Sequence, residues 1–357
     1  MWIFLIVILL LAALLESLSL RGGAGCADGD FSLSKTRAEA GETVELDLTA
    51  RNLGRLPISY LSLRLGFPLS AQLPEDADTR RDRSLLTVTE VFRLWGRRSR
   101  SRALAFSIPK RGVHTVAGRE LARGDFLGLR LSTGRLDCRK TLLVYPPPLR
   151  SSALLEALGS ECGEMSARRW LLRDPVLTLG VREYTGNEPM HEISWSQTAR
   201  RGELMVREFD FTRSLNCCVL LSVSGLSEDD EDELLDRCCG AARTVCDALI
   251  ARGVEAALYT NASLVGYRAE PVRSATASLG RQMDVLDILA RVSPVACSSP
   301  AELAAAALEE QRGAAAFVLI SPHADAATAA ALQILNARSG FGALTVAVDS
   351  LEVDGHD

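Results

Sequence analysis

The feature that most constrains the fold of this chain is a change of hydrophobic pattern at Pro146–Pro148. Upstream, over residues 30–147, apolar side chains recur at every second position in short segments separated by turn residues. Downstream, over residues 214–350, short apolar runs alternate with longer segments of helical character. The first pattern is typical of half-buried strands and the second of strands joined by crossover helices. The chain is therefore predicted to be multidomain, with an all-β sandwich followed by a doubly wound α/β domain.

The sandwich prediction depends on strict alternation. Val44, Leu46 and Leu48 alternate with polar residues, and Leu61, Leu63 and Leu65 repeat the pattern. Further strands are expected at residues 86–95, 103–108, 114–117 and 141–145. The three prolines at 146–148 end the domain because proline cannot donate a hydrogen bond to a strand ladder.

The second domain, residues 214–350, is expected to contain a largely parallel sheet. Its predicted strands are residues 217–221, 256–259, 315–320 and 344–348. Its predicted helices are residues 227–252, 275–290, 300–311 and 326–338. Parallel neighbours need long crossover connections, which these helices supply. Residues 148–213 form a connector, with a short helix expected at 151–159.

Charge and cysteine content restrict the class of protein. A net charge of -5 and a pI near 5.6 give no overall attraction to nucleic acid. The basic cluster Arg97–Arg102 is interpreted as a solvated hairpin or loop, with a phosphate- or headgroup-binding patch as the alternative. The nine cysteines include no C-x-x-C pair, and Cys217 and Cys218 fall on opposite faces of a strand. Buried, reduced thiols are expected, which favours a reducing compartment.

The N-terminal residues 1–20 are predicted to be a transmembrane or membrane-anchor helix. Residues 2–15 are uniformly apolar, and the run reaches bilayer-spanning length if it is extended to Leu20. The nearest positive charge, Arg21, follows the run, so the positive-inside tendency places the bulk of the chain in the cytoplasm, at the cell membrane. Lipidation at Cys26 is an alternative.

Residues 180–209, within the connector, carry an unusual density of aromatic and charged side chains. The candidate motif residues there are Arg182, Glu183, Tyr184, Trp195, Arg200, Arg207 and Glu208. The charged members could form a network that holds the segment together, and Tyr184 and Trp195 could instead anchor a partner, since exposed aromatic and arginine side chains are favoured at binding hot spots.

Polar residues at the carboxyl ends of the predicted parallel strands are the second candidate site, because ligands bind at that edge of open α/β sheets. They include Ser222 and Ser224, Thr260 and Asn261, and the Ser321-Pro-His323 sequence. Asp325, at the start of the next predicted helix, is interpreted as its cap, with a swing toward this edge as the alternative. A hard divalent cation needs carboxylate ligands, so these hydroxyls predict at most a degenerate magnesium site. A pairing of Ser222 with His323 for hydrolysis is a further alternative, but no nucleophile elbow, P-loop or dinucleotide motif accompanies it. No enzymatic activity, cofactor or small-molecule substrate is expected.

The motif resembles the signature of the domain-of-unknown-function-58 family. The matching residues are Gly180-x-Arg182-Glu183-Tyr184, Ile193-x-Trp195, Ala199-Arg200 and Glu203 to Glu208. Upstream, Gly41–Val44, Asn52, Arg111-Gly112 and Gly124–Leu129 also resemble that family. This chain departs from the family pattern at Asn187, Ser194 and Ser222, where acidic residues are usual.

The resemblance implies a bacterial or archaeal membrane protein with an immunoglobulin-like sandwich and a von Willebrand A-like α/β domain. It also implies a non-enzymatic interaction or assembly role, with a MoxR-type AAA+ ATPase as partner. The alternative is a metal-dependent von Willebrand A-type adhesion or binding module that faces outside. Loss of three acidic positions favours the binding role without metal.

Overall fold

The computed structural model describes residues 2, 4, 27–124, 131–169, 178–186, 190, 193–209, 216–226, 231–278, 282–311, 315–338 and 342–352. The predicted membrane anchor at residues 1–20 lies outside these residues, apart from Trp2 and Phe4, and so stays a prediction. Among the described residues, no helix is long and apolar enough to cross a bilayer. The chain divides into two compact units, residues 1–147 with 289–291, and residues 148–288 with 292–357.

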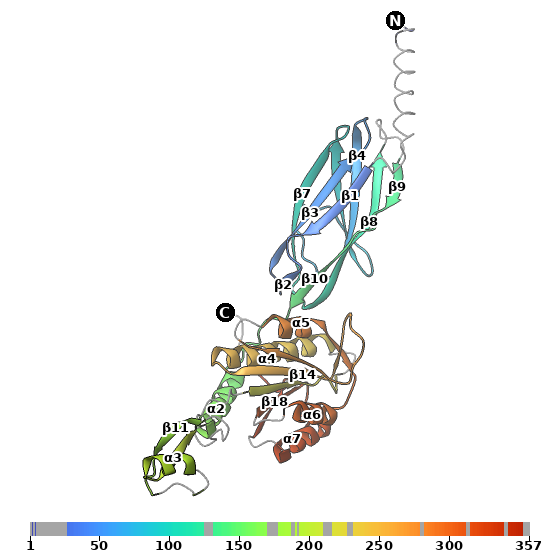
Figure 1. Ribbon diagram of the computed structural model, residues 1–357. Helices are drawn as coiled ribbons and strands as arrows, with labels where there is room; N and C mark the ends of the chain where they lie inside the picture. Colours follow the sequence, from blue (N-terminus) through green and yellow to red (C-terminus); the bar gives the residue numbers. More distant parts are fainter. Residues whose placement is uncertain are drawn as a thin grey trace. The chain divides into compact units, whose positions relative to one another are not determined.

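The first unit is a sandwich of two sheets (Figure 1). One sheet has the order β1-β3-β7, with β1 at Ala27–Leu33, β3 at Thr43–Asn52 and β7 at Ser99–Ser107. The other sheet has the order β2-β10-β8-β4-β6-β5, and β9 pairs with β8. Its strands are β2 at Arg37–Glu39, β4 at Ile58–Phe67, β5 at Thr79–Arg81, β6 at Leu86–Leu94, β8 at Gly112–Gly124, β9 at Leu131–Arg135 and β10 at Arg139–Tyr145.

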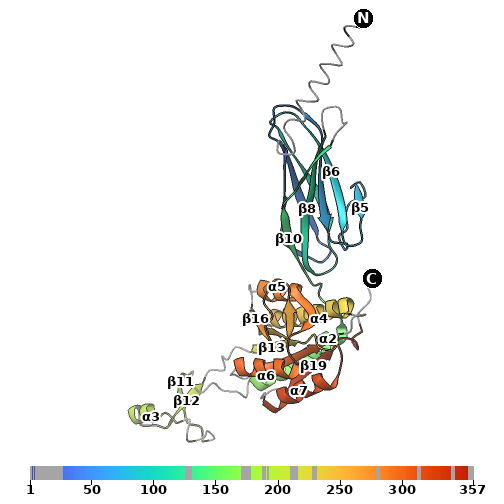
Figure 2. The same cartoon turned by 90° about the vertical axis from the view of Figure 1, so that its right-hand side faces the viewer.

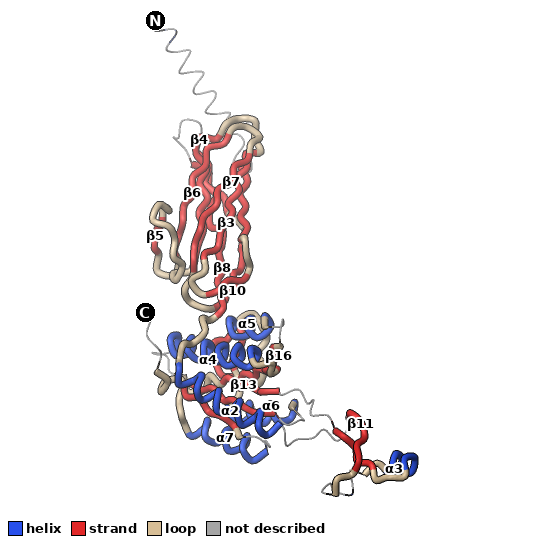
Figure 3. The backbone as a smooth tube through the Cα atoms, turned by 90° about the vertical axis from the view of Figure 1, so that its left-hand side faces the viewer, coloured by secondary structure: helices blue, strands red, loops and turns tan. Residues whose placement is uncertain are grey.

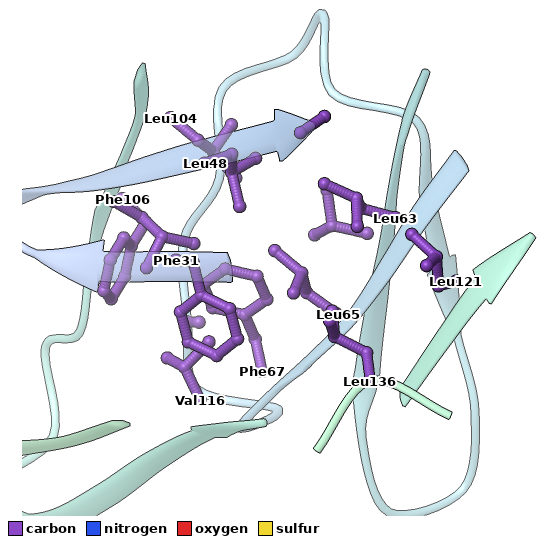
Figure 4. Close-up of a cluster of buried hydrophobic side chains, with 14 of the residues drawn as sticks. Phe31, Leu48, Leu63, Leu65, Phe67, Leu104, Phe106, Val116, Leu121 and Leu136 are labelled. Atoms are coloured by element: carbon purple, nitrogen blue, oxygen red, sulfur yellow. The ribbon is translucent and has the colours of Figure 1, made fainter. Parts of the chain in front are cut away.

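The sandwich core consists of the inward-facing residues of both sheets (Figure 4). Leu46 and Leu48 from β3 and Leu61, Leu63 and Leu65 from β4 are all buried, as their alternation with polar residues predicts. Phe67 and Phe106 meet edge to face with ring centroids 5.2 Å apart. The prediction of an all-β first domain is therefore confirmed.

The second unit is an α/β domain whose mixed β-sheet has the strand order β16-β14-β13-β18-β19 (Figure 2). Strands β13 (Asn216–Leu221), β14 (Glu255–Thr260), β18 (Ala315–Ser321) and β19 (Ala343–Ala347) are parallel. Helices α4 (Glu231–Ala251), α6 (Pro300–Glu310) and α7 (Ala326–Arg338) connect them, and α2 (Ser152–Arg169) precedes the sheet. The predicted strand–helix alternation is confirmed for these four strands and for α4, α6 and α7.

Cys217 and Cys218 lie on opposite faces of β13, as the strand period predicts. Cys218 packs in the cluster formed with α6 and α7, which includes Leu303 and Leu335, whereas Cys217 is absent from that cluster. Both side chains are buried, and burial raises the pKa of the Cys218 thiol to about 12. Cysteine therefore serves here as a small apolar core residue.

The predicted helix at residues 275–290 is wrong over its first half. Residues Arg273–Ala277 form strand β16, which pairs antiparallel with β14 at the sheet edge, and helix α5 spans only Met283–Arg291. Thr276 pairs with Ala257 and Ala275 with Leu258, so an edge position overrides the helix preference of the alanines. A second antiparallel pair, β15 (Ala262–Leu264) with β17 (Val292–Ala296), was also not predicted.

Candidate functional site

The carboxyl ends of the parallel strands bring together buried polar residues from three loops. Ser222, Thr260 and Ser321 follow or end β13, β14 and β18, and all three are fully buried. Since these strands are parallel and adjacent, their ends meet at one edge of the sheet. The sequence-based prediction that this edge is polar is confirmed.

Asn261 joins the loops at this edge. Its Oδ1 accepts a hydrogen bond from the Val223 amide at 3.0 Å. Its Nδ2 donates to Ser224 Oγ at 3.0 Å and to the Ser298 carbonyl at 2.8 Å. The oxygen and both amide hydrogens of this fully buried side chain are therefore hydrogen-bonded inside the protein. Sequence reasoning noted the position after the second strand but selected Thr260, although an amide can cross-link more groups than a hydroxyl.

The hydroxyl groups predicted as a degenerate metal site also have internal partners. Ser222 Oγ accepts from the Ser224 amide at 3.3 Å, and Thr260 Oγ1 accepts from the Ala262 amide at 3.1 Å. No three histidine, cysteine or acidic side chains gather as potential metal ligands among the described residues. The hydroxyls of Ser222, Ser224 and Thr260 by themselves supply no carboxylate oxygen, which a hard divalent cation requires.

His323 and two acidic residues complete the edge. His323 Nδ1 lies 2.8 Å from Asp349 Oδ2, and both side chains are about two-fifths exposed, 43% and 41%. Asp325 Oδ1 accepts from the Thr328 amide at 2.7 Å, which caps α7. Hydrogen bonding with the Thr328 side chain, and to a lesser extent with its amide, holds the pKa of Asp325 below its ordinary value of 3.8. The cap interpretation of Asp325 is confirmed. His323 forms its side-chain hydrogen bond with Asp349, a partner that was not predicted, and not with Ser222.

Residues 178–209 fold into an antiparallel hairpin with a short helix between its strands (Figure 3). Strand β11 (Thr178–Glu183) pairs with β12 (Met205–Phe209), and helix α3 (Trp195–Arg201) lies between them in sequence. Ile193, Met205 and Val206 are buried. Thr198 Oγ1 accepts from the Met205 amide at 3.0 Å and thereby ties α3 to the start of β12.

The candidate motif residues occupy different parts of this hairpin. Glu183 and Arg200 are exposed, whereas Arg182 and Tyr184 are half-buried. The Arg182 guanidinium donates from Nη1 to the Glu183 carbonyl at 3.3 Å. The backbone register sets Arg207 beside Val181 and Glu208 beside Gly180, but the side chains of Arg207 and Glu208 lie outside the description.

Trp195 and Leu204 form the apolar surface of the hairpin. The Ser194 amide donates to the Met205 carbonyl at 2.8 Å, and Ile193 bridges to Val206, so the residue before Trp195 is paired with the residue after Leu204. Trp195 is 60% exposed and Leu204 is 43% exposed. Helix α3 contributes no buried residue, and Arg200 and Arg201 form its last turn. We call this surface the Trp195–Leu204 patch; Leu204 was not among the predicted site residues.

Comparison with known proteins supports the resemblance over part of the chain. Residues 180–353 match the family model described as "Protein of unknown function DUF58". The uncharacterized protein YeaD of Bacillus subtilis (strain 168) is 26% identical over 189 residues, which are 53% of this chain and 46% of that relative. The chain thus spans less than half of the length of this curated relative.

Two solved structures similar to this chain each cover about a third of it. A cohesin module from a Clostridium perfringens family 33 glycoside hydrolase aligns with a TM-score of 0.27 and 10% identity, covering 33% of this chain and 96% of the module. A non-cellulosomal cohesin from Archaeoglobus fulgidus gives a TM-score of 0.24 and 12% identity, covering 33% and 91%. At these scores the likeness carries no inference about function.

Proposed function

We propose that this chain is a membrane-anchored, non-enzymatic interaction protein that binds its partner through the Trp195–Leu204 patch. The resemblance makes a MoxR-type AAA+ ATPase the expected partner. In this proposal residues 1–20 anchor the chain and the two domains are cytoplasmic, the first immunoglobulin-like and the second von Willebrand A-like.

The observation that carries the proposal is the exposure of Trp195 beside Leu204, on a helix that buries none of its residues. A solvent-exposed tryptophan contributes little to the fold, whereas tryptophan and arginine are the residues most enriched at the energetic centres of interfaces. Arg200 and Arg201 supply nearby charge for an acidic partner surface. The internally satisfied hydroxyls and amide at the strand ends further favour binding over metal-dependent chemistry.

The test is a pull-down of the full-length tagged protein from detergent-solubilised native membranes, with and without ATP. Trp195→Ala with Leu204→Ala should reduce recovery of the ATPase at least tenfold while leaving the melting temperature within about 2 °C. The matched control is Val295→Ala, which alters a side chain that is 62% exposed in the α/β domain. Equal recovery by the double variant and the wild type would refute the patch as the interface. Absence of an ATPase from the wild-type sample would refute the expected partner.

A further inference from the structure

We propose that one end of the β-sandwich, formed by residues 51–57 and 93–98, docks onto the surface of an anionic lipid bilayer. We call this end the sandwich tip. The inference rests on the proposed membrane anchorage and adds a second, peripheral contact with the same membrane.

Three large apolar side chains are exposed at the sandwich tip. Trp95 is 77% exposed, Leu53 is 60% exposed and Leu56 is 37% exposed. They belong to the loop between β3 and β4 and the turn between β6 and β7, which lie at the same end of the sandwich (Figure 3). The sandwich core is already filled by other residues, so the fold does not require an exposed tryptophan here. Clustered exposed apolar side chains mark interaction surfaces.

The two segments are held together by hydrogen bonds from the Asn52 side chain and from the backbone. Buried Asn52 donates from Nδ2 to the carbonyls of Leu56 at 2.8 Å and Trp95 at 3.1 Å. The Arg97 amide donates to the Gly54 carbonyl at 2.9 Å. A Cβ at position 96 would collide with the Arg55 carbonyl, so glycine permits this approach. The apolar side chains are therefore presented on a preorganised platform.

The backbone of Arg97, within this platform, has a strained conformation. Its φ of 55° makes it the one non-glycine residue with positive φ among the described residues. A glycine would adopt this conformation without the steric penalty that an arginine incurs. Strain of this kind is typically retained at functional positions, and here it keeps an arginine at the tip.

The charge of the sandwich tip is uniformly positive. Residues 51–57 and 93–98 contain Arg51, Arg55, Arg93, Arg97 and Arg98 and no acidic residue. Arg55, Arg97 and Arg98 are exposed beside the apolar side chains. Tryptophan and leucine surrounded by arginines match a bilayer interface, where aromatic rings lie at headgroup level and cationic side chains meet anionic lipid. The net charge of -5 for the whole chain makes this local excess stand out.

The start of the strand that follows the N-terminal apolar run in sequence favours a bilayer as the occupant. Strand β1 begins at Ala27, whose register partner on β3 is Asn52, the residue that holds the tip together. The apolar residues 2–15 therefore precede a strand that starts at this end of the sandwich. If that run enters a membrane, the chain between Leu15 and Ala27 is short enough to keep the tip near the same surface.

The test measures whether Trp95 contacts lipid in the full-length protein. Trp2→Phe is used as the background so that the apolar run carries no tryptophan. The protein is reconstituted into vesicles of phosphatidylcholine and phosphatidylglycerol (7:3) that contain brominated lipid, and fluorescence quenching is compared with the Trp2→Phe/Trp95→Phe variant. We expect a quenched emission component that disappears with Trp95→Phe. Replacing Arg55, Arg97 and Arg98 by glutamine should reduce that component at least twofold.

The matched control moves the reporter to the opposite end of β4. In the Trp2→Phe/Trp95→Phe background, Leu69→Trp replaces a side chain that is 39% exposed beyond Phe67, and its emission should not be quenched. If the protein floats with the vesicles but Trp95 is not quenched, the tip inference is wrong and the anchor stands. If the protein does not float with the vesicles, both the anchor and the tip contact are refuted.

Discussion

At the scale of single residues, the strand-end edge of the α/β domain is held by side chains whose polar groups are satisfied internally. Asn261 is the strongest example, because its one amide joins the loop after β13 to the segment before α6. Asp325 is a second example, since Oδ1 of its carboxylate caps α7. Both residues make the edge a structural unit whose contribution to stability can be measured.

Asn261→Ala is expected to destabilise the α/β domain by about 2–4 kcal/mol, because it leaves the buried Val223 amide and Ser298 carbonyl without their partner. The free energy of unfolding in urea measures this loss. Ser224→Ala, which removes one partner of the amide, serves as the milder control. A loss below about 0.5 kcal/mol for Asn261→Ala would show that these groups find other partners.

Asp325→Ala is expected to cost about 1 kcal/mol at pH 7 through loss of the helix cap. The pKa of Asp325 is lowered in the folded state, first by the hydrogen bond from Thr328. A lowered carboxyl pKa gives stability that is present above the ordinary pKa of 3.8 and is lost as the pH falls through the folded value. The difference between the wild type and Asp325→Ala should therefore shrink as the pH drops from 5 to below 3.8. Asp325→Asn should retain the cap and show a weaker dependence on pH.

Sequence reasoning succeeded at this scale where a residue acts through its own backbone segment. Asp325 was recognised as a cap because capping depends on local spacing, whereas Asp349 was missed because its contact with His323 is 26 residues distant. The role of Asn261 was missed for the same reason, since its partners lie 37 and 38 residues away. Long-range pairing of polar side chains leaves no periodic signal in a sequence.

At the scale of elements, predictions followed the strength of the hydrophobic period. The burial of β3 alternates strictly, and β4 contains the predicted apolar positions Leu61, Leu63 and Leu65. Helix α6 begins at Pro300 as predicted, and its N-cap Ser299 forms a capping box with Glu302. The predicted helix is wrong over β16 because the side chains of Ser274–Ala277 are small and have no clear hydrophobic period, and pairing with β14 makes this segment a strand. Residues 178–209 have no single period because two strands and one short helix follow each other closely.

Gly202→Ala should loosen the hairpin of residues 178–209. Gly202 ends α3 with a φ of 77°, and alanine in that conformation costs about 1–2 kcal/mol. Hydrogen exchange of residues 195–206 should accelerate several-fold, while exchange of the α/β sheet stays unchanged. Gly180→Ala is the matched control, because its backbone has no positive φ and a Cβ there meets nothing within 4 Å. Equal exchange in both variants would contradict a conformational role for Gly202.

At the scale of the whole molecule, the two units have separate cores. The sandwich core contains Leu65 and Phe67, and the cluster on one face of the α/β sheet contains Leu319 and Leu335. The change of pattern at residues 146–148 predicted this sequence of sandwich and α/β domain because each core imposes its own period on the chain. The proposed membrane anchor and partner also concern the whole molecule, but the hydrophobic period of the sequence predicts neither of them.

Separate cores predict separate unfolding. Leu65→Ala removes a fully buried side chain and should cost about 2–5 kcal/mol in the sandwich. Leu319→Ala should cost a similar amount in the α/β unit. Hydrogen exchange followed by mass spectrometry should show that each variant loses protection only in its own unit. Loss of protection in both units for either variant would show that they unfold as one.

The buried cysteines of the α/β unit make the opening of this domain measurable by thiol alkylation. Cys217, Cys218, Cys238, Cys239 and Cys246 are all buried, and burial raises the pKa of both Cys218 and Cys246 to about 12. A thiol in that state has almost no thiolate at neutral pH and is shielded from reagents. The rate at which these five cysteines are alkylated therefore reports how often the α/β domain opens and exposes its core, and no engineered probe is needed.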